Sequence, residues 1–396
     1  MAIIKRGDNT LDKVNIAIIG CGGIAGAHRK GYEALWENGL REFQIVAACD
    51  VDEQKAADMA GAVAAFQGQC PEVYADVDAM LSSCSTIDAV DICALHRPHH
   101  ILANACLEAG KHVTIEKPLA ITLRAGKTML DTAEKTGKLL YVAENYRRDI
   151  RNRAAKWAMD KGMIGAPRTF HFTDARERLW YWGWREHKQD AGAGWSLDGG
   201  VHFADLFRYY LGEVDELYAI VAAYNTTRYR DREAMADPVE VDVEDTTLAL
   251  LKFENGVTGQ WSSCSVAPGR ETADRIIYGA EGSLEFGGGL QTRTQNLSSD
   301  ELVEAYRKDV SHDEWERNFP RDIMDPIATE LHDFIRWITT GEKAETDGLE
   351  GYKSEAIPIA LFESHALNAP VKLADVEALK HELYQNEINE GLGLIA

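Results

Sequence analysis

Residues 14–26 read VNIAIIGCGGIAG, and this stretch decides the fold. An apolar, β-branched segment passes directly into the pattern G-x-G-x-x-A, and a helical pattern follows it. Gly20 permits a tight turn, Gly22 lets a pyrophosphate approach the backbone, and Ala25 is small enough for close helix-to-strand packing. The stretch therefore predicts the strand, turn and helix of a dinucleotide-binding fold.

Short apolar strands alternate with helical patterns from residue 14 to about residue 143. The strand candidates are NIAIIG, FQIVAACD, IDAVDICA, KHVTIE and LLYVAE. Because they are apolar at nearly every position, we expect them to be buried on both faces, which is typical of a parallel sheet with crossover helices. We predict an α/β fold whose residues 1–143 form a Rossmann domain with a doubly wound parallel sheet.

The pattern changes after residue 143. A helix is expected over about 149–161, followed by the strand candidates RTFHFTDA, ELYAIVAAY, TTLALLKFENGVTGQWSSCS and ADRIIYGAEGSLEFGG, the last two with hairpin turns. The polar segment 291–320 reads as a long surface excursion, and helical patterns close the chain. We predict that residues 144–396 form an α+β domain for substrate binding and oligomerisation, with a large, mainly antiparallel open-faced sheet.

Composition excludes several classes of protein. The 396 residues carry a formal net charge of −22, which repels phosphate backbones, so we expect no nucleic-acid partner. No apolar run reaches the roughly 18 residues of a membrane helix and no apolar leader opens the chain, so we expect a cytoplasmic protein without a membrane partner. Seven cysteines without a C-x-x-C pair suggest neither a disulfide framework nor a zinc knuckle.

An acidic residue closes the second strand candidate. Asp50 can accept the two ribose hydroxyls of a dinucleotide, and its charge repels a 2′-phosphate. We therefore expect NAD as the cofactor, with NADP disfavoured. The cofactor contacts expected from this region are Gly20, Gly22, Gly23, Ile24 and Asp50.

The segment WSLDGGVHFADLF, residues 195–207, spaces Asp198, His202 and Asp205 so that on one helix they would share a face. One imidazole and two carboxylates can form an open metal site, and they can also relay a proton. Alternatively, Asp198 caps the helix while His202 lies in a core and Asp205 faces solvent. The segment alone leaves these three interpretations open.

The segment TIEKPLA, residues 114–120, lies at the carboxyl end of the fifth strand candidate, where open parallel sheets bind their ligands. Pro118 prevents the strand from continuing its ladder. Lysine at the end of a buried strand is costly unless its ammonium group has a partner or faces a cleft, so Lys117 is a functional candidate. The alternative is a surface lysine at a strand exit.

These motifs make the chain resemble the glucose-fructose oxidoreductase, inositol dehydrogenase and MocA family of NAD(P)-dependent dehydrogenases. The resemblance covers nearly the whole chain. It depends on GCGGIAGAH, ACDVD, LEAGKHVTIEKPLA, AGAGWSLDGGVHFADLFRYYLGEV and the closing residues 330–367.

The chain departs from the family pattern at two places. Ala94-Leu95 stands where many members have Thr-Pro, and Gly192-Ala193-Gly194 replaces a triple glycine. The cluster of His96, His99 and His100 after the first departure lies near an expected helix start, where we expect it to be exposed.

The resemblance implies that Lys117, Asp198 and His202 are the catalytic group and that Pro118 follows a cis bond. In the oxidation of a secondary alcohol, His202 would accept the hydroxyl proton, Lys117 would stabilise charge on the oxygen, and Asp198 would orient the group or bind an adjacent hydroxyl. Asp205 then becomes a helix-face residue, and no metal is expected. Further expected cofactor contacts are Leu95, Glu116 and Lys117. The expected substrate contacts are Lys117, Asn145, Arg176, Trp184, Arg185, Asp198 and His202.

Residues 176–185, RERLWYWGWR, are rich in aromatic side chains. Aromatic faces and charged groups match the apolar face and polar edges of a sugar, which is the substrate class that the resemblance implies. The same aromatic residues could instead cover the sheet or form a subunit interface.

We therefore predict an NAD-dependent oxidoreductase that transfers a hydride between a secondary alcohol of a sugar, sugar derivative or inositol-like cyclitol and the nicotinamide. The alternatives are an NAD-dependent glycoside hydrolase that oxidises its sugar transiently and a non-catalytic dinucleotide-binding regulator. We expect a homo-oligomer, a dimer or tetramer through the C-terminal sheet, because an open sheet needs a cover.

Overall fold

The computed structural model describes residues 13–395, which divide into two compact units. The first unit contains the chain up to Leu119, Gly126–Asn145 and Asp313–Gly351. The second contains Ala120–Ala125, Tyr146–His312 and the chain from Tyr352 onward. The sequence pattern predicts a single boundary after residue 143 and gives no sign that residues 313–351 return to the first unit.

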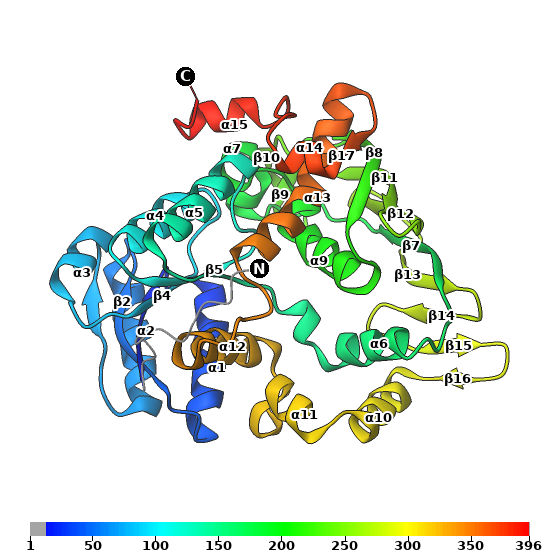
Figure 1. The fold of residues 1–396 in the computed structure, drawn as a ribbon. Coiled ribbons are helices and arrows are strands. Elements are labelled where there is room, and N and C mark those ends of the chain that lie inside the picture. Colours follow the sequence, from blue (N-terminus) through cyan, green and yellow to red (C-terminus); the bar gives the residue numbers. More distant parts are fainter. Residues whose placement is uncertain (1–12, 396) are drawn as a thin grey trace. The chain divides into compact units, whose positions relative to one another are not determined.

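A parallel sheet forms the centre of the first unit. Within the described residues its strands are β1 (Val14–Ile19), β2 (Phe43–Cys49), β3 (Glu72–Tyr74), β4 (Ala89–Ile92), β5 (His112–Glu116) and β6 (Leu140–Ala143). They lie in the order β3-β2-β1-β4-β5-β6, all parallel, so their carboxyl ends meet at one edge (Figure 1). This order is that of a doubly wound Rossmann sheet and confirms the predicted fold class.

The returning segment packs on the helix that follows the glycine turn. The helices involved here are α1 (Gly23–Glu37) and α12 (Pro326–Thr340), which lie side by side (Figure 1). They lie close together at Gly31, where a Cβ would lie 3.2 Å from the backbone of Ala328. Tyr32 and Leu331 are buried in the same core. The other helices that reach the first unit are α2 (Glu53–Gln67), α3 (Val77–Ser83), α4 (His99–Glu108), α5 (Leu123–Thr136) and α11 (His312–Asn318), with a 3-10 turn at Pro320–Asp322.

The second unit is organised around a mixed sheet. Within the described residues its strands are β7 (Pro167–Ala175), β8 (Val214–Ala222), β11 (Thr246–Phe253), β12 (Thr258–Cys264), β13 (Thr272–Gly279), β14 (Gly282–Glu285), β15 (Leu290–Thr292), β16 (Asn296–Leu297) and β17 (Val371–Lys372). Their order is β16-β15-β14-β13-β7-β12-β11-β8-β17. The pair β7 and β12 is parallel and the other neighbours are antiparallel, which confirms the predicted, mainly antiparallel sheet.

One face of this sheet is buried against α9 (Gly200–Leu211). The Phe207 ring lies 5.3 Å from that of Trp261 on β12, and the Phe203 ring lies 4.7 Å from that of Phe172 on β7. The opposite face carries exposed apolar side chains at Ile220, Leu248 and Leu250. The strand period of two therefore divides the sheet into a packed face and an open one.

The remaining elements of the second unit are short apart from the helices α6 (Ile150–Asp160), α10 (Ser299–Asp309) and α13 (Gly348–Leu367). The short elements are α7 (Lys188–Ala191), α8 (Trp195–Asp198), α14 (Leu373–Glu377) and α15 (Asn386–Gly391), the 3-10 turns at Tyr146–Arg148 and Gly183–Glu186, and the hairpin of β9 (Thr227–Asp231) and β10 (Ala236–Glu240). Among residues 13–395, no helix combines the length and the apolar composition that crossing a bilayer requires.

The interpretation of residues 291–320 as a surface excursion is wrong. This segment contains β16 and α10, and α10 begins with a capping box in which Ser298 and Glu301 satisfy each other's backbone N–H groups. The sequence Ser-x-x-Glu carries that signal. The overall polarity of the segment conceals it.

We expect Gly20→Ala to lower the free energy of unfolding by about 2–4 kcal/mol. Gly20 has a φ of +84°, and a Cβ there would lie 2.8 Å from the nitrogen of Ala94 and from the carbonyl group of Cys93. Gly22→Ala is the matched control, because its Cβ would have no neighbour within 4 Å. Urea denaturation of both variants measures the difference. An equal loss of unfolding free energy in the two would contradict the steric requirement for glycine at position 20.

Candidate active site

The turn after β1 leaves room for an anion at the carboxyl edge of the first sheet. Gly22 is the N-cap of α1 and has no side chain to bond the first backbone N–H groups of the helix. Added Cβ atoms at Gly22 and Gly23 would have no neighbour within 4 Å. Helix N-termini of this kind bind phosphate groups, so the turn fits the pyrophosphate of a dinucleotide.

Asp50 follows β2 and faces this turn. Its Oδ2 accepts a hydrogen bond from the backbone nitrogen of Cys21 at 2.7 Å, and its Oδ1 accepts one from Asp52 at 2.9 Å. Each carboxylate oxygen keeps a second lone pair that a ribose hydroxyl can use. Asp50 therefore also stabilises the glycine turn, a role that sequence spacing does not reveal.

Apolar side chains stand exposed in the same unit. Ile24 is 37% exposed, Leu95 is 50% exposed and Val51 is 95% exposed. Ile24 and Leu95 are among the cofactor contacts that the sequence predicts, whereas Val51 is not. Its signal in the sequence is an apolar residue directly after the acid that closes β2. Exposed apolar surface beside an anion-binding turn fits the flat rings of a dinucleotide.

Lys117 follows β5 and is half-buried. Its peptide bond to Pro118 is cis, as the family resemblance implies. Glu116 Oε2 accepts a hydrogen bond from the backbone nitrogen of Lys117 at 3.2 Å, and Nδ1 of His99 lies 3.0 Å from the carbonyl oxygen of Pro118. The backbone of Lys117 is thus held from both sides.

The expectation that the histidine cluster is exposed is wrong. His96, His99 and His100 are all buried. Burial lowers the pKa values of His99 and His100. The two ring nitrogens of His99 face backbone carbonyl oxygens, so this side chain fixes the loop that leads into α4 rather than facing solvent.

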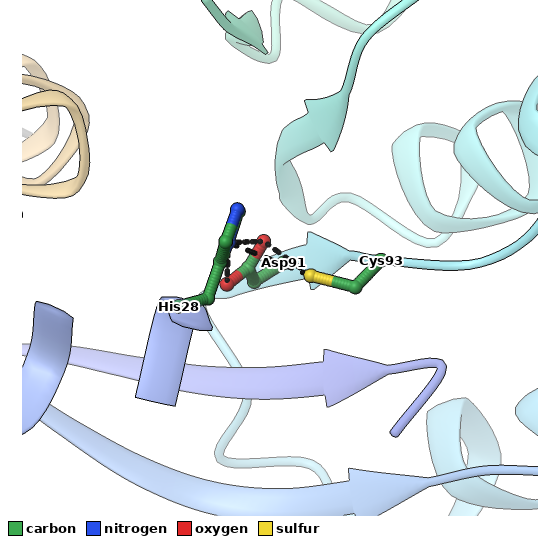
Figure 2. A group of neighbouring side chains, drawn as sticks. All are labelled: His28, Asp91 and Cys93. Atoms are coloured by element: carbon green, nitrogen blue, oxygen red, sulfur yellow. Dashed lines mark hydrogen bonds and ion pairs between the residues drawn. The ribbon is translucent and has the colours of Figure 1, made fainter. Parts of the chain in front are cut away.

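His28 of α1 connects this region to the glycine turn. Its Nδ1 lies 3.0 and 3.1 Å from the two carboxylate oxygens of Asp91, and its Nε2 lies 2.9 Å from Oε1 of Glu116 (Figure 2 shows the Asp91 side). The hydroxyl of Tyr32 donates to the Asp91 carboxylate at 3.1 Å. A carboxylate faces each ring nitrogen, and a ring that donates to both is doubly protonated and positively charged.

The surroundings of His28 agree with this charge. Burial alone would lower the pKa of His28, but the charges and hydrogen bonds of its neighbours, Asp91 first and then Cys93, together hold the pKa well above its ordinary value. The Cys93 thiol lies 3.5 Å from Nδ1, and burial raises the pKa of that thiol so that it stays neutral. The result is a buried ion cluster of Asp91, His28 and Glu116.

A metal could also be considered at His28, Asp91 and Cys93, because one ligand atom of each lies within 4.8 Å of the others. Metal ligation requires a neutral imidazole and a thiolate. The contacts of Nδ1 and Nε2 with two carboxylates and the raised pKa of the thiol favour the opposite protonation states. We therefore interpret the group as an ion cluster.

In the second unit, Asp198 and His202 lie on different helices. Asp198 ends α8, and α9 begins at Gly200 with Gly199 as its N-cap, so the interpretation of Asp198 as a cap is wrong. The break allows close packing, because a Cβ at Gly199 would lie 2.3 Å from the Trp195 ring and one at Gly200 would lie 2.8 Å from the Trp261 ring.

Both side chains are buried and in contact with neighbours. The His202 ring stacks on that of Tyr146, with centroids 4.0 Å apart and planes 3° apart. The Asp198 carboxylate lies 3.4 Å from Nε of Arg185. The stack orients the imidazole and the arginine orients the carboxylate.

The expectation that Asp205 faces solvent is wrong. Asp205 is 1% exposed, and its carboxylate accepts hydrogen bonds from Nε, at 2.7 Å, and from Nη2 of Arg147. The Ser354 hydroxyl donates to it at 2.9 Å. Asp205 therefore anchors the segment that carries Tyr146, which in turn stacks on His202.

A buried carboxylate also holds the turn before α8. Glu244 accepts hydrogen bonds from the backbone nitrogens of Gly194 and Ser196 at 2.7 and 2.9 Å. A Cβ at Gly194 would lie 2.9 Å from the Glu244 carbonyl oxygen, which explains why this position of the altered triple glycine keeps glycine.

The other expected substrate contacts are divided between the units. In the first, Oδ1 of Asn145 is buried and has no hydrogen-bond partner within residues 13–395. In the second, Cζ of Arg185 lies 4.4 Å from the Trp184 ring centre. Arg176 is engaged by Asp174, through bonds of 2.7 and 2.8 Å, so its charge is already compensated.

The N-terminal and the central part of the chain each match a known protein family. Residues 14–144 match the oxidoreductase family with an NAD-binding Rossmann fold, and residues 152–285 match the GFO/IDH/MocA C-terminal domain.

Individual relatives align over nearly their whole length. Levoglucosan dehydrogenase of Pseudarthrobacter phenanthrenivorans is 27% identical over 93% of this chain and 100% of its own. Myo-inositol 2-dehydrogenase of Thermotoga maritima is 24% identical over 92% of this chain and 99% of its own. The crystal structure of levoglucosan dehydrogenase in complex with NADH superposes with a TM-score of 0.72 at 25% identity, over 91% of this chain and 99% of that one.

We expect His28→Gln to destabilise the protein more in mildly acidic than in alkaline solution. The folded-state pKa of His28 is raised, so its stabilising contribution is complete below about pH 6.5 and is lost as the pH rises through the folded pKa. At about pH 6 the variant should lose about 3 kcal/mol, because it leaves the buried carboxylates of Asp91, Glu116 and Glu330 without the cation that they face.

Denaturant unfolding at about pH 6 and about pH 9 measures this difference. His312→Gln, at an exposed position on α11, is the matched control and should show no such pH dependence. A constant gap between wild type and His28→Gln over this range would show that His28 is not charged in the folded protein.

Proposed function

Because the chain belongs to the GFO/IDH/MocA family of NAD-binding oxidoreductases, we propose that it transfers a hydride between a secondary alcohol of a sugar, sugar derivative or cyclitol and NAD. The observation that carries this proposal is the position of Lys117, directly after β5 on the sheet edge that also bears the glycine turn. That edge is where an open parallel sheet places its ligands.

NAD supplies the hydride acceptor when it is bound, and the chain's residues must handle the proton. We assign His202 as the base that accepts the hydroxyl proton, since an imidazole nitrogen can take up a proton and release it again. Lys117 donates a hydrogen bond to the reacting oxygen and stabilises negative charge on it. Asp198 accepts a hydrogen bond from an adjacent hydroxyl, with Arg185 holding its carboxylate.

The cofactor contacts proposed are the glycine turn, Asp50 and the exposed apolar side chains of Ile24, Val51 and Leu95. Asp50 disfavours NADP, because its carboxylate would repel a 2′-phosphate. Glu116 contributes indirectly by fixing the backbone of Lys117. Asn145 offers a buried acceptor, Oδ1, to a substrate or ribose hydroxyl.

We expect Lys117→Ala and His202→Ala each to lower kcat by at least about 100-fold while NADH binding, followed by fluorescence titration, persists. Lys127→Ala is a matched control, since Lys127 is an exposed lysine paired with Asp131 on α5. Near-normal turnover of both variants would refute the assignment of these roles.

The substrate class is tested by following NADH absorbance over inositol isomers, aldoses, anhydrosugars and keto-sugars, with NAD and NADP in parallel. Net NADH formation supports the dehydrogenase. Sugar release from glycosides without net NADH would instead identify the hydrolase alternative. Dinucleotide binding with neither reaction would identify the regulator.

We also propose that the open face of the second sheet is covered by a second copy of the chain. On this face Leu248 pairs with Ile220, and Leu250 pairs with Tyr218, across β11 and β8. Ile220, Leu248 and Leu250 are 49%, 47% and 64% exposed, which is unusual for neighbouring large apolar residues on one surface.

We expect Leu250→Lys to shift the protein toward the monomer in light scattering, because a charge at the centre of an apolar interface must be desolvated. Ile101→Lys is the matched control, since Ile101 is a comparably exposed apolar residue on α4 of the first unit. An unchanged mass of the Leu250 variant would exclude this face as the interface.

A further inference from the structure

A pocket of the second unit surrounds Asp198. Its lining includes Arg178, Trp182, Arg185, Trp195 and Asp198. All of these residues come from the aromatic-rich residues 176–185 or from α8. The pocket therefore brings arginines, two indole rings and two of the expected substrate contacts, Arg185 and Asp198, together.

Each carboxylate of this pocket already has a partner. Asp198 lies 3.4 Å from Nε of Arg185, and Glu186 lies 3.5 Å from Nε of Arg228. Glu244 accepts the two backbone N–H groups described above. Arg228 additionally donates to backbone carbonyl oxygens of Asn225 and Thr227.

Arg178 differs from its neighbours. Arg176 and Arg275 both bind the Asp174 carboxylate, at distances between 2.7 and 3.0 Å. The guanidinium of Arg178 makes no hydrogen bond or ion pair with any residue of 13–395, and its Nε is buried without a partner. Burial, followed by the charge of Arg176, lowers the pKa of Arg178, as expected of a cation that lacks a bound anion.

Indole rings hold this guanidinium in place. Cζ of Arg178 lies 4.7 Å from the Trp195 ring centre, 5.4 Å from that of Trp180 and 5.5 Å from that of Trp182. A guanidinium stacked on aromatic rings uses its faces and keeps its N–H edges for a planar, bidentate acceptor. A carboxylate is such an acceptor.

We propose that this pocket binds the carboxylate of an acidic sugar, a uronic acid, with Arg178 as the carboxylate-binding residue. The indole faces of Trp182 and Trp195 then contact the apolar face of the sugar ring, and Asp198 accepts a hydrogen bond from a ring hydroxyl. This inference rests on the proposed function, because it names the substrate class of the same site.

The test compares uronic acids with their neutral twins, D-glucuronate with D-glucose and D-galacturonate with D-galactose, by the initial rate of NADH formation. We expect the full-length wild-type protein to prefer the uronate at least about 10-fold in kcat/KM. In Arg178→Gln the ratio of uronate to neutral sugar should fall about 10- to 100-fold, mainly through KM, and Arg178→Lys should restore part of it. Arg230→Gln, an exposed arginine of β9 paired with Asp237, should leave the ratio unchanged.

A second measurement does not depend on turnover. Calorimetric titration of D-glucuronate into the protein with NADH should show binding to wild type and none to Arg178→Gln. If this holds without NADH formation, the pocket is confirmed and the proposed oxidation fails. Equal binding by wild type and variant, no binding by either, a preference for neutral sugars or a preference for the corresponding sugar phosphates would overturn the inference.

Discussion

The imidazole ring of His28 lies between two buried carboxylates, and the geometry of the first unit around Lys117 depends on this contact. Asp91 lies in β4, Glu116 is the last residue of β5, and His28 lies on the helix that starts at the glycine turn. One cation thus connects the dinucleotide turn with the residue before Lys117. Buried ion pairs contribute little net stability because desolvation offsets attraction, so we infer that the main effect of this cluster is to fix position.

In the second unit, too, buried charged groups fix the positions of the candidate catalytic residues. The carboxylate of Asp205 binds Arg147, which holds the segment of Tyr146, and Tyr146 orients His202 by stacking. Glu244 fixes the backbone that leads to Asp198. In each unit, therefore, buried charges fix the backbone next to the candidate catalytic residues, or the side chains that orient them, without needing to contact a substrate.

The sequence predicts those features of the fold that short motifs encode. The glycine turn and the buried parallel strands follow from short motifs, the cis bond before Pro118 is implied by the family resemblance, and the structure has all three. Sequence reasoning missed features that depend on long-range packing. The return of residues 313–351 brings Ala328 against Gly31, and the break before α9 brings Gly200 against the ring of Trp261. Neither partner is visible in a local window.

The spacing of residues in the sequence does not reveal which charged side chains form ion pairs in the folded protein. Arg176 and Arg178 are two residues apart and look equivalent in the sequence. Arg176 binds Asp174, whereas Arg178 lies among indole rings and forms no ion pair with any carboxylate of residues 13–395. A half-buried cation without an ion pair is energetically costly. The carboxylates of this pocket all have partners, so a bound ligand explains the unpaired Arg178 more simply than packing does. Stacking keeps that cation oriented until the anion arrives, which lowers the entropy lost on binding.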